Sequence, residues 1–135
     1  MQTLKIKQLA ERLNVSPHTL RFYDGEGLFP DITRDEHGTR IFSEDSLEWV
    51  HLVLCLRSTG MSVADIKNYV RLCAEGDCTV MERYQIILKQ KRKAEEEMRE
   101  MERRLRLLAK KEQHYLDMIE CNGSDACNPA AKARA

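Results

Sequence analysis

The fold of this chain is decided by residues 16–24, which read Ser16-Pro17-His18-Thr19-Leu20-Arg21-Phe22-Tyr23-Asp24. Ser16 is a favourable N-cap because its hydroxyl can accept a hydrogen bond from an unpaired backbone N–H. Pro17 suits the first helical position, where no N–H is needed and its fixed φ fits the helix. Leu20 is the one clear core anchor. The stretch therefore predicts a short helix that presents polar side chains to something outside the protein.

The residues before this stretch predict a second helix. Ile6, Leu9, Ala10 and Leu13 recur at helical spacing within Leu4–Leu13, which indicates an amphipathic helix. Asn14 and Val15 form a short link to Ser16. Two helices joined by a tight turn, the second with a polar outer face, are typical of a helix-turn-helix, which we place at about residues 6–25.

The residues after it predict a wing and two more helices. Residues 32–42 are not helical in pattern, and Gly38 is followed by β-forming residues, which favours a hairpin. Ser43 and Ser62 are each positioned to cap a further helix, and Gly60 suits the C-terminal end of the first of these. Together these elements predict a mainly α-helical, winged helix-turn-helix domain over residues 1–74.

A heptad pattern dominates residues 79–120. Steps of four and three from Val80 select an apolar seam, in which Lys91 and Glu112 are the polar exceptions. The other seam residues are Tyr84, Ile87, Ala94, Met98, Met101, Leu105, Leu108, Tyr115 and Ile119. A helix of this length cannot bury its seam on the small domain before it. We therefore expect a coiled coil with a second copy, either antiparallel or parallel. Residues 121–135 are expected to form a flexible tail that contains cysteine.

Composition excludes several functional classes. No run of about 18 apolar residues exists, so no membrane association is expected, and residues 1–6 lack the apolar stretch of a signal peptide. We therefore expect a cytoplasmic protein whose five cysteines are reduced thiols. Neither a set of nucleophile, base and orienting residue nor a glycine loop for phosphate is present, so the sequence does not predict an enzyme.

The order of elements resembles that of the MerR family of bacterial transcription regulators. The segment Thr19-Leu20-Arg21-Phe22-Tyr23-Asp24-Gly25-Glu26-Gly27-Leu28 is similar to the signature of that family, as is Gly38-Thr39-Arg40-Ile41-Phe42-Ser43. The run Cys55-Leu56-Arg57-Ser58-Thr59-Gly60-Met61-Ser62 looks like the NmlR/AdhR subgroup, whose members respond to aldehydes and other electrophiles through a cysteine on a helix.

The resemblance implies a function and a set of DNA contacts. A homodimer, held by an antiparallel coiled coil, would bind a palindromic promoter operator and distort its spacer, with RNA polymerase at the same promoter. Arg21 and Tyr23 would hold phosphates, Arg40 would do so from the wing, and His18 and Thr19 would lie nearest the base edges. The full set of DNA-binding candidates is Ser16, His18, Thr19, Arg21, Tyr23, Arg34, Arg40, Arg57 and Lys67.

Charge leaves an alternative open. Residues 1–74 carry nine Lys and Arg against ten Asp and Glu, whereas a DNA-binding domain is usually basic. A coiled-coil interaction module with a structural helix-turn-helix is therefore the alternative to DNA binding.

The cysteines suggest two triggers. His51 lies one helical turn before Cys55, and a neighbouring imidazolium would favour a reactive thiolate at this sensor candidate. A buried cysteine that acts as a small hydrophobe is the alternative, and this is also the interpretation for Cys73. No cofactor is expected, but a thiolate-bound metal ion, held by Cys78, Cys121 and Cys127 where the ends of two antiparallel helices meet, is a second hypothesis.

Overall fold

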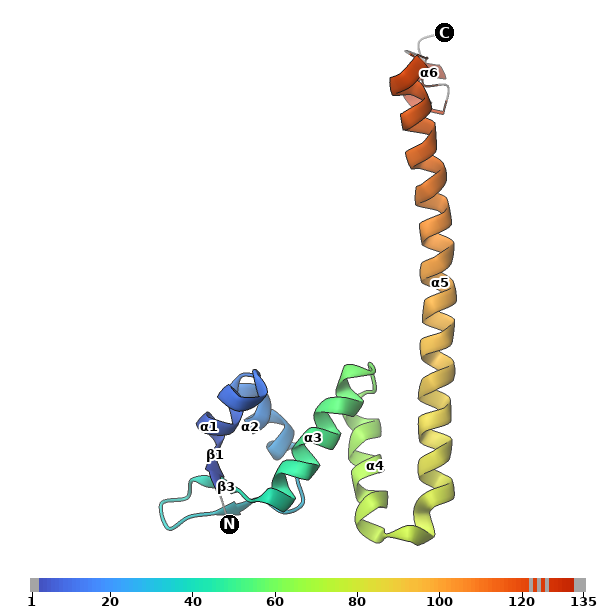
Figure 1. The fold of residues 1–135 in the computed structure, drawn as a ribbon. Helices are drawn as coiled ribbons and strands as arrows, with labels where there is room; N and C mark the ends of the chain where they lie inside the picture. Colours follow the sequence, from blue (N-terminus) through green and yellow to red (C-terminus); the bar gives the residue numbers. More distant parts are fainter. Residues whose placement is uncertain (1–2, 122, 124, 126, 133–135) are drawn as a thin grey trace. The chain divides into compact units, whose positions relative to one another are not determined.

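The computed structural model describes residues 3–121, 123, 125 and 127–132. The chain divides into two compact units at Ala94, and each is described by itself. Figure 1 follows the order of the elements along the chain. No helix among the described residues is both long and apolar enough to cross a membrane.

The helix-turn-helix consists of α1 (Ile6–Leu13) and α2 (Pro17–Gly25). Asn14 ends α1 in the left-handed conformation, with φ of 55°, which asparagine tolerates better than most residues. Ser16 Oγ then accepts a hydrogen bond from the backbone N–H of Thr19 at 3.0 Å. The predicted cap is therefore present, and it fixes where the second helix begins.

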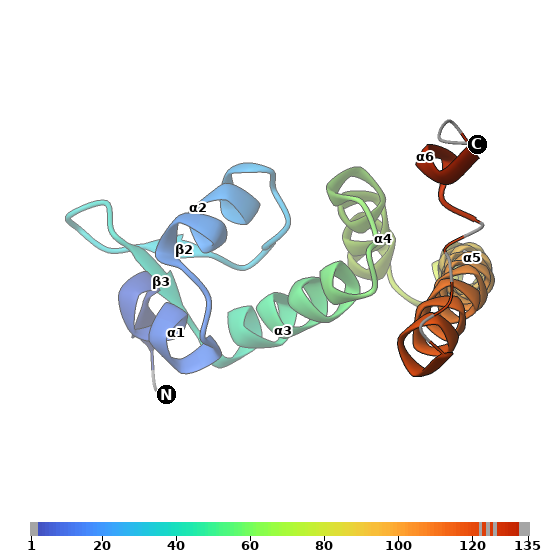
Figure 2. The ribbon, with the colours of Figure 1, turned by 90° about the horizontal axis from the view of Figure 1, so that it is seen from above.

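A small sheet supports the two helices. β2 (Thr33–Arg34) and β3 (Arg40–Phe42) form the predicted hairpin, whose loop extends beyond α1 and α2 in Figure 2. β1 (Leu4–Lys5) pairs antiparallel with β3, so the strand order is β1-β3-β2. The prediction of a helix from Leu4 is wrong at its first two residues, because their backbone groups pair with Ile41 and Phe42.

The core lies where α1, α2, the sheet and the next helix, α3 (Glu44–Ser58), meet. Leu9, Leu20 and Phe42 are fully buried. The rings of Tyr23 and Phe29 meet edge to face, and Phe29 meets Phe42 in the same way. Tyr23 is only 8% exposed. The expectation that Leu20 alone anchors α2 is therefore wrong, since Tyr23 is a second anchor.

Two capped helices complete the domain. α3 (Glu44–Ser58) begins where Ser43 Oγ accepts from the N–H of Ser46, and α4 (Val63–Glu75) begins in the same way at Ser62. The buried hydroxyl of Ser46 donates to the carbonyl of Asp31 at 2.8 Å. This bond fastens the start of α3 to the segment that leaves α2.

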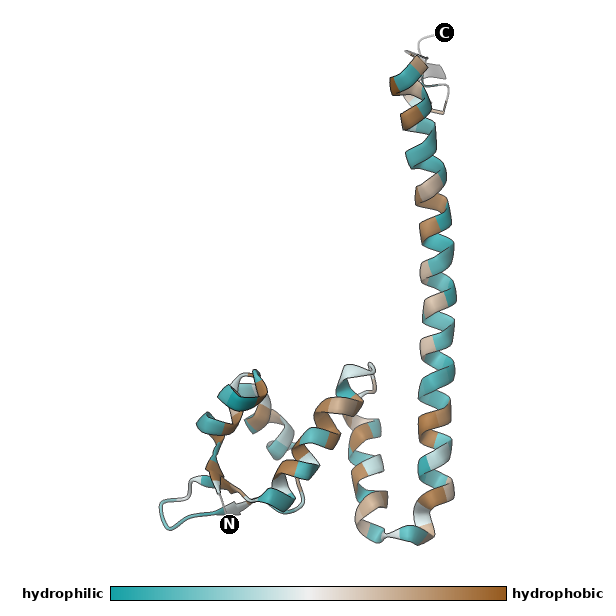
Figure 3. Cartoon of the chain, viewed as in Figure 1, coloured by the Kyte–Doolittle hydropathy of each residue, from teal (hydrophilic) through white to brown (hydrophobic). Residues whose placement is uncertain are grey.

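The long helix follows a short 3₁₀ turn, η1 (Asp77–Thr79). α5 (Val80–Cys121) has 42 residues, so the predicted helix is present and ends one residue beyond the predicted bound. Its first turns pack on the N-terminal unit, where Ile86 contacts the core. Apolar residues recur along the rest of the helix in Figure 3, and seam side chains such as Met98 and Leu108 are more than 60% exposed.

The end of the chain contacts α5. His114 Nε2 and Asp125 Oδ1 lie 2.7 Å apart, and this hydrogen bond lowers the pKa of the Asp125 carboxyl. The His114 ring is therefore partly covered and paired. A four-residue helix, α6 (Pro129–Lys132), follows. The predicted flexibility of residues 121–135 stays a prediction, and residues 122, 124, 126 and 133–135 of that segment lie outside the described residues.

Candidate nucleic-acid interface

The outer face of α2 presents three exposed side chains. His18 and Arg21 point away from the core, as expected. Phe22 is 50% exposed, which leaves an aromatic ring on the surface that the sequence had not singled out. The buried ring of Tyr23 helps to position the helix. The expected contact of Tyr23 with a phosphate stays a prediction.

The start of α2 is held by two hydroxyls. Ser16 Oγ and Thr19 Oγ1 lie 2.8 Å apart, and Ser16 also accepts from the Thr19 N–H. Both groups therefore already have partners within the protein. The structure gives Ser16 and Thr19 a role in shaping the first turn, which fixes the direction in which His18 and Arg21 project.

Asp35 organises the tip of the wing. Its Oδ1 accepts hydrogen bonds from the backbone N–H groups of His37 and Thr39, each at 2.9 Å. Gly38 takes φ of 77°, a conformation open to glycine without strain. Arg34 Nη1 donates to the Gly38 carbonyl at 2.7 Å. The wing is thus a closed loop with the exposed Arg34 at its base.

An ion pair joins the wing to the recognition helix. Arg40 Nε donates to Asp24 Oδ2, and the two side chains are only 22% and 16% exposed. The predicted contact of Arg40 with a phosphate stays a prediction. In the structure its guanidinium is partly covered and its Nε donates to Asp24, so Arg40 also holds β3 against the end of α2.

Removal of this pair gives a direct test. Asp24→Ala leaves the half-buried Arg40 without its acceptor and is expected to lower the free energy of unfolding by about 1–3 kcal/mol. Urea denaturation followed by circular dichroism measures this loss. Glu36→Ala is the matched control, because Glu36 pairs with His37 at the surface and should change stability by less than about 0.5 kcal/mol. An equal effect of both substitutions would refute a structural role for the pair.

Two further cations lie on α3 and α4. Lys67 is exposed, and its Cε lies 3.9 Å from where a Cβ at Gly27 would stand. It therefore lies beside the loop that follows the recognition helix. Arg57 Nη1 donates to the carbonyl of Met61 at 3.0 Å and stabilises the turn between α3 and α4. Arg57 and Lys67 therefore come from the end of α3 and from α4, respectively.

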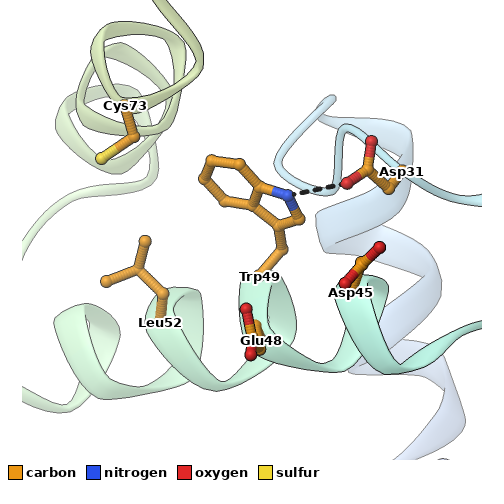
Figure 4. Close-up of a pocket in the computed structure, with 6 residues that line it drawn as sticks. All are labelled: Asp31, Asp45, Glu48, Trp49, Leu52 and Cys73. Carbon is orange, nitrogen blue, oxygen red and sulfur yellow. Dashed lines mark hydrogen bonds between the residues drawn. The ribbon is translucent and has the colours of Figure 1, made fainter. Parts of the chain in front are cut away.

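The cysteines have different environments. Cys55 and His51 are both exposed on α3, so the alternative of a buried Cys55 is wrong. Cys73 is partly buried and lines a pocket of about 350 Å³ with Trp49, Leu52 and three carboxylates (Figure 4). The adjacent Tyr69 has its pKa raised, mainly by burial and further by Cys73, while Arg83 opposes the rise. Cys73 is therefore at the edge of the core rather than within it.

The proposed metal ligands are not brought together within one chain. Cys78, Cys121 and Cys127 are all exposed. Among the described residues, no three His, Cys, Asp or Glu side chains are grouped so that they could hold a metal ion.

Comparison with known proteins identifies the family. The model of the MerR HTH family regulatory proteins matches residues 4–73, which include the helix-turn-helix, the wing, α3 and most of α4. The chain belongs to the MerR family. Like its relatives, it is a DNA-binding transcriptional regulator and not an enzyme.

Relatives place this MerR-family chain near the NmlR/AdhR subgroup. An uncharacterised HTH-type regulator of Haemophilus influenzae is 40% identical over 113 residues, which cover 84% of each chain. AdhR of Bacillus subtilis is 33% identical over 84 residues, which cover 62% of this chain and 60% of AdhR. The crystal structure of HiNmlR, a MerR family regulator lacking the sensor domain, bound to promoter DNA, is 37% identical. It covers 90% of this chain and 97% of its own, with a TM-score of 0.73.

Two features of this MerR-family interface were missed from the sequence. The Arg40–Asp24 pair joins residues 16 positions apart, so no local pattern predicts it. The exposure of Phe22 was missed because an aromatic residue is usually expected in the core. The spacing of Phe22 from the core anchor Leu20 was the available signal, because a residue two positions further along a helix projects from about the opposite side.

Proposed function

We propose that this MerR-family regulator binds a palindromic promoter operator as a homodimer and alters transcription by distorting the operator spacer. We further propose that an aldehyde, another electrophile or thiol stress triggers the change through Cys55. The observation that carries the proposal is the outer face of α2, where His18 and Arg21 project from a helix fixed by its cap and by the Asp24–Arg40 pair. Similarity to HiNmlR, a regulator crystallised on promoter DNA, supports it.

Each side chain of the interface has a proposed role. Arg21 and the wing residue Arg34 neutralise phosphates, and His18 lies nearest the base edges. Lys67 contacts the DNA backbone beside the loop after α2, and Arg57 does so from the end of α3. Because the charge of the domain as a whole is nearly balanced, this local group of cations supplies most of the electrostatic attraction.

The dimer is proposed from the exposed seam. Met98, Leu105 and Leu108 are each at least 60% exposed in the single chain, and an apolar stripe of this length is typical of a coiled coil. A two-fold axis through the coiled coil would set the distance between two copies of α2, and hence the separation of the operator half-sites.

Spacer distortion explains how a bound protein could change transcription. Bending or untwisting a promoter of 20–30 base pairs costs a few kcal/mol, which additional backbone contacts can offset. The distortion would realign the two promoter elements that RNA polymerase contacts. The regulator could switch a gene without leaving the DNA.

Cys55 is the proposed sensor. Its exposed thiol can add to an aldehyde carbonyl: a carbon–sulfur bond forms, the proton moves to the oxygen, and the product is a hemithioacetal. The step needs no oxidant. His51, one turn earlier on the same face of α3, is placed to assist the proton transfer. The resemblance of residues 55–62 to the NmlR/AdhR subgroup supports this class of inducer.

A metal trigger is the second candidate. Cys78 precedes α5 and Cys121 ends it, so an antiparallel pair would bring these exposed thiols from two chains towards one another. Soft thiolate ligands would select copper(I), zinc or mercury. If one of these ions changes transcription from the promoter, and Cys121→Ser abolishes that change, the metal hypothesis is correct.

Binding and distortion are tested on the promoter region of the protein's own gene. A gel shift with excess competitor DNA is expected to give a sequence-preferring complex, and footprinting should show two protected half-sites related by a two-fold axis. Insertion of two base pairs into the spacer should leave binding in place but change transcription. Failure to prefer any sequence would refute operator binding. An unchanged transcriptional response with the longer spacer would refute distortion alone.

A further inference from the structure

We propose that the pocket between α3, α4 and the loop after α2 binds a small organic cation, namely a quaternary or protonated amine with an apolar body. Trp49, Leu52 and Cys73 form the inner surface of this pocket, and three carboxylates lie at its edge. None of these residues is among those proposed above for DNA contact or for the thiol trigger. The site therefore goes beyond the proposed regulator function and does not depend on it.

The inner surface of the pocket is apolar and already assembled. Trp49 and Leu52 project from α3 and pack, partly buried, against the core. Figure 4 shows the Trp49 ring between Cys73 of α4 and Asp31 of the loop after α2. The indole Nε1 donates to Asp31 Oδ2 at 3.1 Å, which fixes the orientation of the ring. A ligand would therefore meet an indole that is already held in place.

The edge of the pocket is negatively charged. Asp31, Asp45 and Glu48 are exposed there and come from two different segments of the chain. In the part of the chain that the structure describes, none of these three carboxylates forms an ion pair with a Lys, Arg or His side chain. Like charges gathered at a concave surface raise the local concentration of ions of the opposite sign. The pocket therefore favours a positively charged ligand.

An organic cation suits this pocket better than a metal ion does. The carboxylates lie around the cavity and do not converge on one point, since no three potential ligands among the described residues are grouped to hold a metal. Magnesium and calcium prefer a shell of oxygen ligands and would gain nothing from Trp49 or Leu52. The face of an indole, by contrast, attracts an ammonium group through its quadrupole. The apolar inner surface and the anionic edge together match an ammonium group on an apolar body.

Size and position further define the ligand. The volume of about 350 Å³ is near the lower end of the range of about 300–1,000 Å³ that is typical of small-molecule sites, so one ring with an ammonium group suits it better than a polycyclic compound. Asp31 belongs to the loop after α2, and its carbonyl accepts a hydrogen bond from Ser46 at the start of α3. A bound cation would therefore contact α3, α4 and the loop that leaves the recognition helix at the same time.

Intrinsic fluorescence reports directly on this pocket, because Trp49 is the only tryptophan of the chain. The full-length protein is titrated at constant ionic strength with benzyltrimethylammonium, which carries one ring and one quaternary ammonium group. We expect a saturable change in emission, with half-saturation at roughly 1 mM or below. N,N-dimethylbenzamide, a neutral probe of similar size, should need a concentration severalfold higher because it lacks the charge.

Substitutions on α3 test the role of the carboxylates. Glu48→Gln is expected to weaken binding of benzyltrimethylammonium by about twofold to fivefold, which is the usual contribution of one exposed ion pair. Asp45→Asn in addition should weaken it further. Glu44→Gln is the matched control, because Glu44 is equally exposed in the first turn of the same helix but does not line the pocket. This control should bind the probe as the unchanged protein does.

Alkylation of Cys73 gives a second readout that does not use the indole. The other four cysteines of the full-length chain are replaced by serine, so that Cys73 is the one remaining thiol. Saturating benzyltrimethylammonium should slow the reaction of Cys73 with iodoacetamide severalfold, because the bound probe covers the thiol. Trp49→Leu in the same background should lose most of this protection, since no indole remains to attract the ammonium group.

Three results would each overturn the proposal. The first is emission from Trp49 that does not change up to about 10 mM benzyltrimethylammonium. The second is binding of the neutral amide at the same concentration as the cation. The third is protection of Cys73 that is equal in the Glu48→Gln and Glu44→Gln variants. Circular dichroism of each variant verifies that its helices are intact, so that a loss of binding is assigned to the pocket.

Discussion

Replacement of Cys55 by alanine is expected to abolish the transcriptional response to formaldehyde while operator affinity stays within about twofold. The response is lost because no thiol remains at this position to form the hemithioacetal. Affinity is kept because Cys55 is exposed on α3, and surface substitutions of this kind change free energies by only about 0.5 kcal/mol. A reporter fused to the cognate promoter measures the response, and a gel shift measures the affinity.

Three other cysteines provide the controls for this experiment. Cys127→Ser removes an equally exposed thiol at the far end of the chain and should leave the response intact. Cys73→Ala removes the partly buried thiol beside Trp49 and tests whether that pocket contributes. A normal response from Cys55→Ala, combined with a lost response from Cys121→Ser, would contradict the proposed trigger and favour the metal candidate.

The second large effect is expected at Arg21. Arg21→Ala should weaken operator binding by roughly tenfold or more, because a charged hydrogen bond to phosphate contributes about 1.5–3 kcal/mol. The slope of log affinity against log salt should also fall by about one, as expected for the loss of one phosphate contact. Fluorescence anisotropy across a salt series measures both quantities on the same operator.

Arg99 gives the control for charge alone. It is exposed on α5 and paired with Glu96, so Arg99→Ala removes the same charge away from α2. Its affinity and its salt slope should match those of the unchanged protein. If Arg21→Ala lowers affinity but leaves the salt slope unaltered, Arg21 does not contact a phosphate, and a base contact becomes the better assignment.

The helix-turn-helix could be predicted because its signals are local. Ser16 and Pro17 act within one helical turn, and the Ser16 hydroxyl does accept the Thr19 N–H. Local signals did not predict secondary structure correctly where a partner distant in sequence determines it. Leu4 and Lys5 continue a helical pattern, but hydrogen bonds to β3 draw them into a strand.

The internal contacts of the site were not predicted, for the same physical reason. The polar tips of Tyr23 and Arg40 suggested donors to phosphate, which stays a prediction. The sequence did not show that the Tyr23 ring packs on Phe29 or that Arg40 pairs with Asp24. Both partners lie far along the chain or on another element, so the composition of α2 alone could not reveal them. Long periodic features were easier: α5 begins and ends within one residue of the bounds expected from its heptads.

The contact between Asp24 and Arg40 also bears on how such a regulator can diversify. Because the Asp24–Arg40 pair fastens the wing to α2, we expect the two elements to approach DNA together. A graft of residues 1–74 onto the coiled coil of a relative should carry the choice of promoter with it, while the recipient keeps its own half-site spacing.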